Sequence, residues 1–309
     1  MAGTRSSDIP KLIVDGIDVI FNRELSKPIP MEYPSICTEL SNEKEVGIYQ
    51  QLGNIGPAYV IPEGDDFTFS KLEESYQTTI QVQSVGNAVA HSWVAMKNDL
   101  YNVIPQLFGK VMVDTLVEQR EQTIADLYNH GFATTGADGV YVFSDSHPLT
   151  NSALLNDNLL DNEAMGVESL KKAYNRFLYI KGQSGRKFPT KATHLLFHAE
   201  KTFTVMELLE SNLLAMELSN TVNSLKGLPV KPVASRYLDI DSNGDAPWFM
   251  LDRTLADAGA ILQRQTGVEV DTWVNHESKE FRASVIERYG AKMVAPGYGC
   301  VGSVGLYTA

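Results

Sequence analysis

The chain has 309 residues, of which 43% are apolar and 21% are charged, and its formal net charge is −12. This length can bury a large core in one elaborate domain or two, and the composition is that of a soluble globular protein. So strong a negative charge excludes non-specific attraction to nucleic acid as the main activity. No apolar run approaches the roughly 20 residues of a membrane span, and the start lacks a signal-peptide core. We therefore expect a cytosolic protein without membrane association.

Cysteine use points to a reducing compartment. The two cysteines, Cys37 and Cys300, lie far apart in the sequence, so their spacing suggests no disulfide framework. Disulfides persist mainly in oxidising compartments, which agrees with a protein made and kept in the cytosol.

Residues 1–44 are predicted to form an N-terminal arm. Leu12 to Phe21 carry a short apolar pattern compatible with one brief helix. Pro28, Pro30 and Pro34 follow, and each proline fixes its own φ and pushes the preceding residue towards extended conformations. Such a segment has little core of its own, so we expect it to be disordered or laid over a neighbouring chain.

Residues 45–86 are predicted to form a long hairpin. The second leg, 76–83, alternates β-favouring residues with glutamine and threonine, which is the period-two pattern of a strand. The first leg, 55–62, contains two prolines and suits only an edge strand, and Pro62 to Asp66 form the turn signal. A hairpin with one polar face is too thin to be stable alone. It therefore needs another surface, which is the first indication of a partner subunit.

The segment from Asp99 to Gly131 is predicted to be a long helix around which the chain is organised. Residues 102–129 would span about 40 Å at 1.5 Å per residue, and Gly131 suits the position just past the end. The expected apolar stripe consists of Leu107, Phe108, Val111, Met112, Leu116, Ile124, Leu127 and Tyr128. The expected charged face consists of Glu118, Arg120 and Glu121. One apolar face and one charged face make this helix a spine across which other elements can lie.

The remaining chain is predicted to mix short strands with two further helices. A strand is expected at Val140–Phe143, a polar loop at 150–162 and a helix within 163–181. The apolar face of that helix is expected to hold Leu170, Ala173, Tyr174, Phe177 and Leu178.

Residues 190–270 are expected to alternate short strands with one amphipathic helix at 201–211. The stripe of that helix is expected to hold Phe203, Met206, Leu209 and Leu213. Residues 280–294 are expected to form two strands turned at Gly290. The predicted fold class is therefore α+β with long extensions.

Several stretches, taken in order, resemble the major capsid proteins of tailed bacteriophages, especially the Mu-type major head subunits. The stretches are YQTTIQVQSV, the long helix, DGVYVFSDSHPL, THLLFHAEKTFTVMELLES, APWFMLDRT and EFRASVIERYGAKM. Together they cover most of residues 45–295, and the ordered set is more specific than any one of its members.

The resemblance implies the Hong Kong-phage capsid fold. The implied parts are an N-terminal arm (1–44), an extended hairpin loop (45–90), a peripheral domain with the spine helix (91–189 and 271–309) and an axial domain (190–270). Some members carry a long helical scaffolding segment before the arm, and this sequence has none. A separate scaffold, a cleaved segment and a shell that needs no scaffold all stay open, although the N-terminal Met argues against cleavage.

The resemblance implies a structural, non-enzymatic protein that self-assembles into the icosahedral shell enclosing phage double-stranded DNA. Its partners would be copies of itself in pentamers and hexamers, with a scaffolding protein and a portal. It would be assembled in the host cytoplasm, mature from a procapsid and reside in the virion. An encapsulin-like nanocompartment shell, which encloses protein cargo in the same fold, is the alternative.

A hydrolase using Ser144, Asp145, Ser146 and His147 is the alternative from another class. A catalytic triad needs a base within about 3 Å of its nucleophile, usually from distant segments, and adjacent residues of an extended segment point to opposite faces. A polar turn ended by a proline is therefore expected instead, and we expect no catalytic residue.

No metal site or cofactor is expected. His194 and His198 lie in a predicted strand, where four residues span about 13 Å, too far for one metal ion. Asp239–Gly244 matches the opening of a calcium loop, but Met250 stands where a bidentate Glu is required, so an exposed turn is expected. Walker and dinucleotide motifs are missing from the sequence. Lys71, which could carry an isopeptide cross-link in some relatives, has no identifiable partner.

The tip of the hairpin is the predicted contact with a neighbouring subunit. Its apolar residues lie near the end of an element too thin to bury them, so a neighbour must supply the other wall. The predicted contact residues are Tyr59, Ile61, Pro62, Glu63, Gly64, Asp65 and Phe67, with Phe69 close by.

Overall fold

The computed structural model describes residues 31–52, 58–67, 69, 74–98, 103–150, 152–211, 222–275 and 277–307. Within these ranges the helices are α2 (Tyr33–Ile36), α3 (Trp93–Asn98), α4 (Val103–Asn129), α5 (Val167–Tyr179), α6 (Thr202–Glu210) and α7 (Pro296–Gly299). The strands are β1 (Cys37–Ser41), β2 (Val46–Leu52), β3 (Glu74–Gln81), β4 (Gln83–Ser92), β5 (His147–Leu149), β6 (Ser152–Asn156), β7 (Leu159–Leu160), β8 (His194–His198), β9 (Lys231–Ser235), β10 (Trp248–Leu251), β11 (Gly259–Asn275), β12 (Glu280–Val294) and β13 (Cys300–Ser303).

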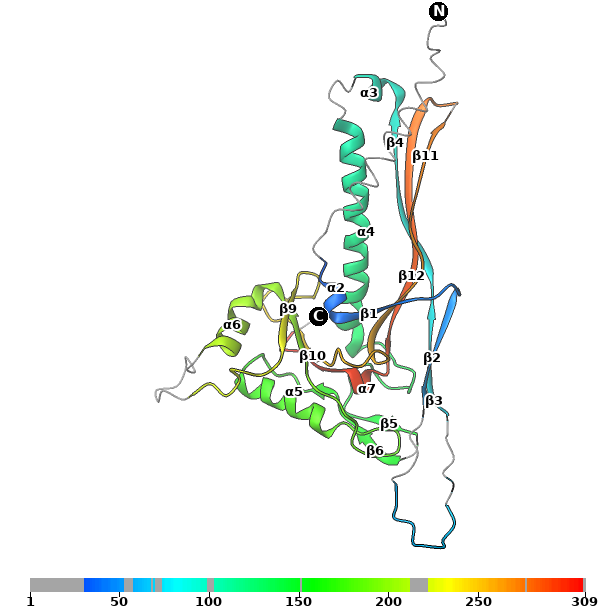
Figure 1. Cartoon of the computed structure of the whole chain (residues 1–309). Coiled ribbons are helices and arrows are strands. Elements are labelled where there is room, and N and C mark those ends of the chain that lie inside the picture. Colours follow the sequence, from blue (N-terminus) through cyan, green and yellow to red (C-terminus); the bar gives the residue numbers. More distant parts are fainter. Residues whose placement is uncertain are drawn as a thin grey trace, which may run out of the picture.

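The molecule has a long part, a broader part and a projecting hairpin (Figure 1). In the long part, α4 runs beside a sheet with strand order β1-β11-β12-β4. In the broader part, α5 and α6 pack on one face of a sheet with order β7-β13-β10-β8-β9. Strands β2 and β3 form the hairpin. The predicted α+β class is therefore confirmed.

The spine helix is confirmed, and α4 ends at the predicted residue, Asn129. Met112, Leu116, Ile124 and Tyr128 are buried. Met112 and Leu116 pack against Ala283 and Val285 of β12, and Tyr128 reaches the core at the junction with the broader part. The side chains of Leu107 and Phe108 lie outside the described residues.

Two details of the spine prediction are wrong. Val111 was placed in the apolar stripe but is 45% exposed. Arg120 and Glu121 were placed on a solvated face but are buried. Hydrophobic periodicity assigns a charged residue to solvent, whereas here polar partners on other elements compensate its burial.

Gly131 lies just past the end of α4, as predicted, without a left-handed conformation. It lies in a short 3₁₀ turn, His130–Phe132, that continues α4. A Cβ at this position would come 2.6 Å from the ring of Phe143. Glycine is used here for close packing, not for a positive φ.

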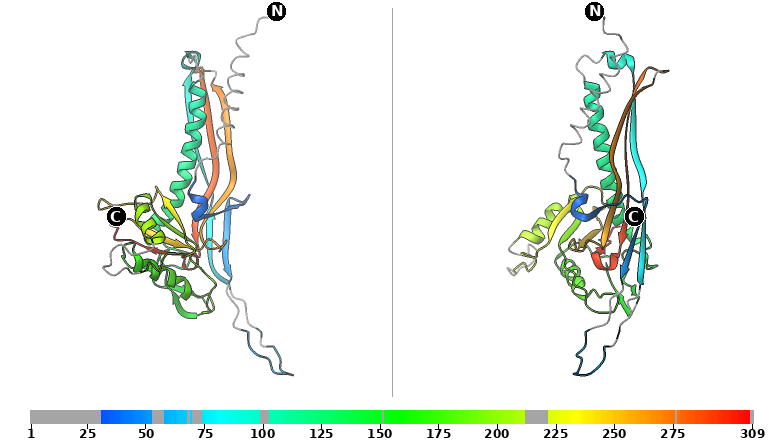
Figure 2. Two further views of the ribbon diagram at one scale, coloured as in Figure 1. Left: turned by 60° about the vertical axis from the view of Figure 1, so that its left-hand side comes forward. Right: turned by 45° about the vertical axis from the view of Figure 1, so that its right-hand side comes forward.

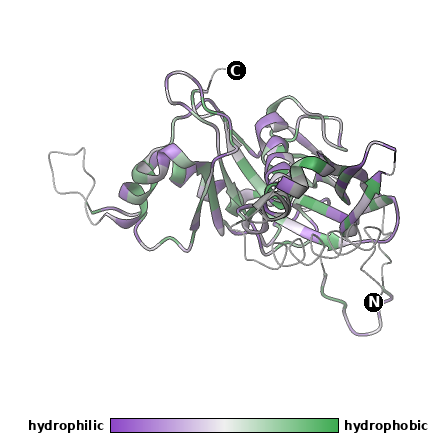
Figure 3. Ribbon diagram, turned by 90° about the horizontal axis from the view of Figure 1, so that it is seen from above, coloured by the Kyte–Doolittle hydropathy of each residue, from purple (hydrophilic) through white to green (hydrophobic). Residues whose placement is uncertain are grey.

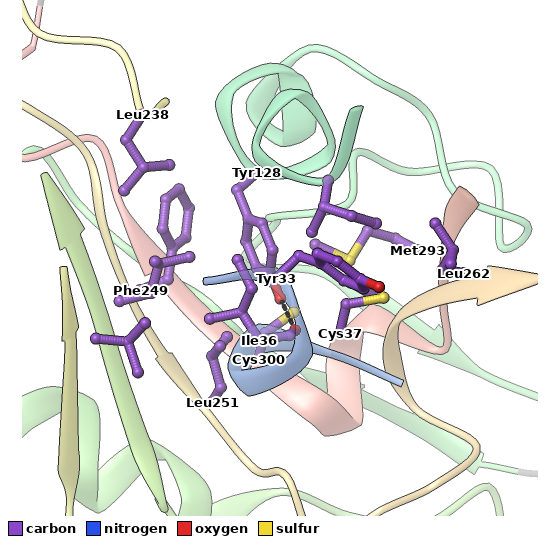
Figure 4. Packing of buried hydrophobic residues seen from close by; sticks show 14 of the residues in the cluster. Tyr33, Ile36, Cys37, Tyr128, Leu238, Phe249, Leu251, Leu262, Met293 and Cys300 are labelled. Atoms are coloured by element: carbon purple, nitrogen blue, oxygen red, sulfur yellow. Dashed lines mark hydrogen bonds between the residues drawn. The ribbon is translucent and has the colours of Figure 1, made fainter. Parts of the chain in front are cut away.

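Part of the predicted arm belongs to the core of its own subunit. Residues 1–30 lie outside the described residues. Pro34 stands in the first turn of α2, where its missing N–H costs nothing. Tyr33, Ile36 and Cys37 are buried, β1 pairs in parallel with β11, and the hydroxyl of Tyr128 donates a 2.7 Å hydrogen bond to the carbonyl of Ile36 (Figure 4).

Both cysteines are free and buried in this core, as Figure 4 shows beside Tyr128. Burial raises the pKa of the Cys37 and Cys300 thiols to about 12, so both remain protonated at neutral pH. They act as small apolar residues.

The hairpin is confirmed, but its first leg lies elsewhere. Strands β2 and β3 pair antiparallel from Val46 opposite Gln81. Thr78, Ile80 and Val82 are buried while their neighbours on the other face are exposed, so the predicted alternation holds. The first strand ends before the prolines, because proline cannot donate to a ladder.

The segment after the spine differs from the prediction. Val140–Phe143 makes only an isolated antiparallel bridge, from Tyr141 to Thr135: the N–H of Val142 donates to the carbonyl of Thr134, and that of Phe143 donates to the carbonyl of Gly131. The predicted polar loop at 150–162 contains strands β6 and β7. The polar composition of this segment suggested an exposed loop. Asn156 is nevertheless buried, because its side chain exchanges hydrogen bonds with the backbone of Lys181.

Strands β8, β9 and β10 match the predicted segments, whereas the C-terminal strand pair was predicted wrongly. β12 is one continuous strand, antiparallel to β11, and Gly290 lies inside it opposite Gln263. A Cβ at Gly290 would come 2.3 Å from the backbone oxygen of Gln81. The glycine therefore permits β3 to cross closely over β12 instead of turning the chain.

The two helices of the broader part are confirmed, with different buried faces. Leu170, Ala173 and Phe177 of α5 are buried, but Leu178 is exposed. On α6, Leu209 packs against the core as predicted, but Phe203 and Met206 are exposed and Val205 is buried in their place. Leu213 lies outside the described residues. Viewed along the long part, the strands between the helices carry long hydrophobic stretches (Figure 3).

The division into peripheral and axial domains remains a prediction. Strand β11 runs across the expected boundary at residue 270, and β13 joins the sheet of the broader part. Within the described ranges, no helix combines the length and hydrophobicity that a membrane span requires. In the same ranges, no cluster of three or more His, Cys, Asp or Glu side chains could hold a metal ion.

Candidate assembly surface

The tip of the hairpin extends beyond the paired strands and away from the rest of the chain (Figures 1 and 2). Pro62–Asp65 form the predicted turn, in which the N–H of Asp65 donates a 3.2 Å hydrogen bond to the carbonyl of Pro62. Gly64 has a φ of +93°, a conformation that strongly favours glycine. The turn chemistry read from the sequence is therefore present.

Large apolar side chains on this tip face solvent within one subunit. Val60 is 91% exposed, Phe67 71% and Phe69 96%, and Tyr59 is half exposed. Pro62, Glu63, Gly64 and Asp65 are exposed, and Ile61 is partly buried. All of these except Val60 were named in the prediction of the tip, and the subunit covers few of them.

The base of the hairpin, in contrast, is fixed to its own subunit. Ile80 packs in a buried cluster with Ile261 and Val294. The hydroxyl of Tyr49 donates to Oε1 of Gln263 at 3.1 Å, and Nε2 of Gln263 donates to the carbonyl of Lys44 at 3.0 Å. A held base and an uncovered tip suit an element that reaches a neighbour.

A second uncovered apolar patch lies on the broader part. Phe203 and Met206, three residues apart on α6 and therefore neighbours on its surface, are exposed. Contiguous exposed apolar groups of this kind mark interaction surfaces in soluble proteins. The sequence already contained the signal, since the apolar residues of α6 are too numerous for one buried face.

The segment Ser144–His147 does not form a nucleophile–base pair. The Nδ1 of His147 lies 2.5 Å from Oδ2 of Asp138, and its Nε2 lies 2.9 Å from Oδ1 of Asn158. The hydroxyl of Ser144 lies 3.2 Å from the hydroxyl of Ser146. Both ring nitrogens are engaged with other groups, so this histidine holds a loop together in the geometry observed.

Asn158 fixes the direction of these hydrogen bonds. Its Nδ2 donates to the carbonyl of Val142 at 2.9 Å, so its Oδ1 is the acceptor for the N–H of Ser144 and for Nε2 of His147. Nε2 therefore carries a proton. The Nδ1 contact with Asp138 then needs a proton on the imidazole or on the carboxyl group, which makes this pair a charge-assisted or acid–base hydrogen bond.

The other residues considered as metal ligands are either far from one another or form hydrogen bonds within the fold. His194 and His198 stand at opposite ends of β8, where Nδ1 of His198 accepts the N–H of Glu200. At the predicted exposed turn, Oδ1 of Asp241 accepts the N–H groups of Asn243 and Asp245, and Met250 is a buried residue of β10. Lys71 lies outside the described residues.

A spine helix beside a long sheet, a broader α/β part and an overhanging hairpin together define the fold class of icosahedral shell subunits. No protein-family model and no curated protein sequence matches this chain. Solved structures do: the capsid of Ralstonia phage GP4 has a TM-score of 0.59 at 11% identity, covering 90% of this chain and 92% of that chain. The capsid of a native GTA particle has a TM-score of 0.59 at 10% sequence identity, covering 90% of this chain and 91% of that chain. The procapsid of bacteriophage JBD30 has a TM-score of 0.50 at 15% sequence identity, covering 97% of this chain and 76% of that chain.

The chain therefore has the fold of phage capsid subunits, the Hong Kong-phage capsid fold that the resemblance implied. The narrower likeness to Mu-type head subunits stays a prediction, because identities near one residue in ten establish the fold and not the subfamily.

Proposed function

We propose that this protein is a structural major capsid protein that self-assembles into an icosahedral shell around phage genomic DNA. The observation that carries the proposal is the capsid fold, shared over about nine tenths of both chains with the capsids of a phage and of a GTA particle. A fold shared over so much of both chains supports a shared way of associating.

The tip of the hairpin supports the proposal energetically. Tyr59, Ile61, Pro62, Glu63, Gly64, Asp65 and Phe67 form the proposed contact with an adjacent subunit. Burying one large apolar side chain is worth about 1.5–3 kcal/mol, and ordering a residue costs about 1–2 kcal/mol of backbone entropy. Several exposed apolar groups on one loop can offset that cost only if a neighbour covers them.

The proposed partners are copies of the same chain, in pentamers and hexamers, together with a scaffolding protein and a portal. The shell would assemble in the host cytoplasm, mature from a procapsid and reside in the virion. A net charge of −12 suits a wall that encloses a polyanion without adhering to it. The shell would enclose double-stranded DNA without sequence-specific binding.

Two alternatives are less well supported. An encapsulin-like shell would use the same kind of fold but would enclose protein. A hydrolase using Ser144 and His147 would need the imidazole near the serine hydroxyl, whereas its nitrogens contact Asp138 and Asn158.

Electron microscopy and sedimentation of the purified protein test the proposal. Closed shells of uniform size are expected, and only monomers or small oligomers under all assembly conditions would contradict it. The content of shells isolated from infected cells, nucleic acid or protein, separates the phage capsid from the nanocompartment. A hydrolytic activity that His147→Ala abolishes would contradict the proposal that the protein is structural and non-enzymatic.

A further inference from the structure

One stretch of this acidic chain is entirely without acidic residues. Residues 169–199 contain no Asp or Glu, in a protein of net charge −12. Their basic residues are Lys171, Lys172, Arg176, Lys181, Arg186, Lys187 and Lys191. Helix α5 and the turn that follows it therefore carry a local basic surface.

An open hollow of about 450 Å³ lies on this surface, between α5, β6 and the segment 179–181. Lys172, Arg176 and Lys181 line it, together with one acidic residue, Asp157. Leu155 and Tyr179 also line it and are 53% and 73% exposed. The hollow thus combines positive charge with uncovered apolar surface.

Part of this positive charge has no internal counterpart. Lys172 pairs with Glu163, and Arg176 pairs with Asp157. Lys181 pairs with no acidic side chain of the described residues, and a backbone bridge places it beside Lys187. A lysine without an acidic partner at the edge of an open hollow favours an acidic group from another chain.

The tip of the hairpin has the inverse composition. Residues 58–69 include Glu63, Asp65 and Asp66 and no Lys or Arg. All three acidic residues are exposed, and the apolar Val60 and Phe67 flank them. The tip therefore combines negative charge with apolar groups, and the hollow combines positive charge with apolar groups.

The tip cannot be the occupant of the hollow of its own subunit in the conformation described. The hydroxyls of Ser75 and Thr150 lie 2.8 Å apart, and Nε2 of Gln183 donates to Oε1 of Gln51 at 3.2 Å. These bonds tie the base of the hairpin to the broader part. Figures 1 and 2 show the tip projecting beyond this base and away from the body of the subunit.

We propose that the hollow lined by Lys172, Tyr179 and Lys181 receives the hairpin tip, residues 58–67, of a second copy of this chain. Glu63, Asp65 and Asp66 would lie against the basic residues, and the apolar groups of the tip would cover Leu155 and Tyr179. The inference rests on the proposed function and names the surface that the tip recognises. Two different patches in contact make a head-to-tail interface, which generates a ring where the rotation between subunits closes.

Nucleic acid is the other anionic partner that a basic surface could take. The observations favour the tip, because binding to phosphates requires positive charge but gives no role to Leu155 and Tyr179. A peptide with apolar residues on both sides of its acidic turn uses both properties of the hollow.

Charge reversal with complementation tests the proposal. Lys172→Glu with Lys181→Glu, and separately Glu63→Lys with Asp65→Lys, should each lower the yield of closed shells by about tenfold or more. The four changes combined should restore the yield to within about twofold of the wild type. Lys44→Glu with Lys110→Glu, two exposed lysines elsewhere, is the matched control and should leave the yield unchanged.

Disulfide trapping gives a second measurement. Asp65→Cys combined with Tyr179→Cys should give covalent multimers on non-reducing gels, because the native Cys37 and Cys300 are buried. Asp65→Cys combined with Lys110→Cys should not. Trapping by the first pair supports the proposal even where a charge-reversal variant fails to fold.

The outcomes separate the further inference from the proposed function. A wild-type protein that forms no shells overturns the proposed function. Wild-type shells together with normal assembly of the Lys172→Glu, Lys181→Glu variant overturn the assignment of the hollow alone. Normal shells that lose their nucleic acid in that variant, measured by absorbance at two wavelengths, would also overturn it in favour of nucleic acid.

Discussion

The Nε of Arg120 on the spine helix lies 3.2 Å from Oε1 of Glu287 on β12, and both side chains are buried. Arg264 pairs with Glu39 at 3.1 Å nearby, and the hydroxyl of Tyr33 accepts hydrogen bonds from both guanidinium groups. This cluster explains why a charged residue interrupts the apolar row of α4. The spine is joined to the sheet by charge at the level where its hydrophobic contacts change from one cluster to another.

Arg120→Met should strongly destabilise the subunit at neutral pH. Removing one partner of a buried ion pair costs about 3–5 kcal/mol, because the other charge remains buried without compensation. Adding Glu287→Gln should recover most of the loss in unfolding free energy, measured with urea. Arg282→Met, which breaks the more exposed pair with Glu280 on the same strand, should cost about 1 kcal/mol or less. A double variant no more stable than Arg120→Met would contradict this account.

Stability should also depend on pH through Glu287. Burial raises the pKa of this carboxyl above its ordinary value of 4.5, and Arg120 opposes the rise. Between 4.5 and the raised value, the folded state therefore binds more protons than the unfolded state. The Glu287 contribution to unfolding free energy is then full below pH 4.5 and declines as the pH rises through the raised pKa.

Glu287→Gln removes this titration while keeping a similar shape. The difference in unfolding free energy, wild type minus variant, should therefore decrease as pH increases through that window. Urea unfolding at several pH values measures it. A difference that increases with pH would show that the folded-state pKa is lowered instead.

Gly290→Ala should destabilise the subunit, although the position lies in a regular strand. The new Cβ would come 2.3 Å from the backbone oxygen of Gln81, so β3 or β12 must move, and overpacking typically costs about 1–3 kcal/mol. Gly267→Ala in the partner strand β11 is the matched control, because nothing lies within 4 Å of its Cβ position. Equal thermal stability of the two variants would contradict the proposed close crossing.

Asn158→Ala should be among the more destabilising substitutions in the segment after the spine. This buried amide accepts from Ser144 and His147 and donates to Val142, and its loss leaves three polar groups without these partners. Each buried unsatisfied group costs about 1–3 kcal/mol. Asn158→Asp, which retains the acceptors and removes the donor, should lose less than the alanine variant in urea unfolding.

Much of the fold could be predicted because its long elements repeat simple periods. Apolar residues at intervals of four from Met112 to Tyr128, interrupted only by Arg120, identify the helix α4. The alternation of residue types from Tyr76 to Gln83 identifies the strand β3. The errors arise where a distant segment decides the environment. The sequence alone predicts a turn at Gly290, because it does not show that β3 crosses the strand there. It predicts a solvated Arg120, because it does not show that Glu287 pairs with this side chain.

The candidate surface was predictable only on one side. Prolines, an acidic turn and aromatic residues on a thin hairpin identify the tip from local sequence. The hollow that we assign to its partner combines Leu155 of β6 with Lys172 of α5 and Lys181 beyond it. Those residues meet only in the folded chain, although the acid-free stretch 169–199 is visible in the sequence.

The last prediction separates the folding of the subunit from its assembly at the hairpin tip. Val60→Ser, Phe67→Ser and Phe69→Ser together should change the unfolding free energy of the isolated subunit by about 0.5 kcal/mol or less, because all three side chains are exposed there. In a shell each would be buried against a neighbour, where it is worth about 1.5–3 kcal/mol, so closed shells should be lost.

Deleting residues 60–68 and closing the gap with a short Gly-Ser turn should have the same effect on assembly. Sedimentation and negative-stain imaging measure shell yield, and urea unfolding measures the subunit. Normal shells from either variant would refute the claim that the tip clamps neighbouring subunits. A large loss of subunit stability would instead mean that these side chains are covered within their own chain.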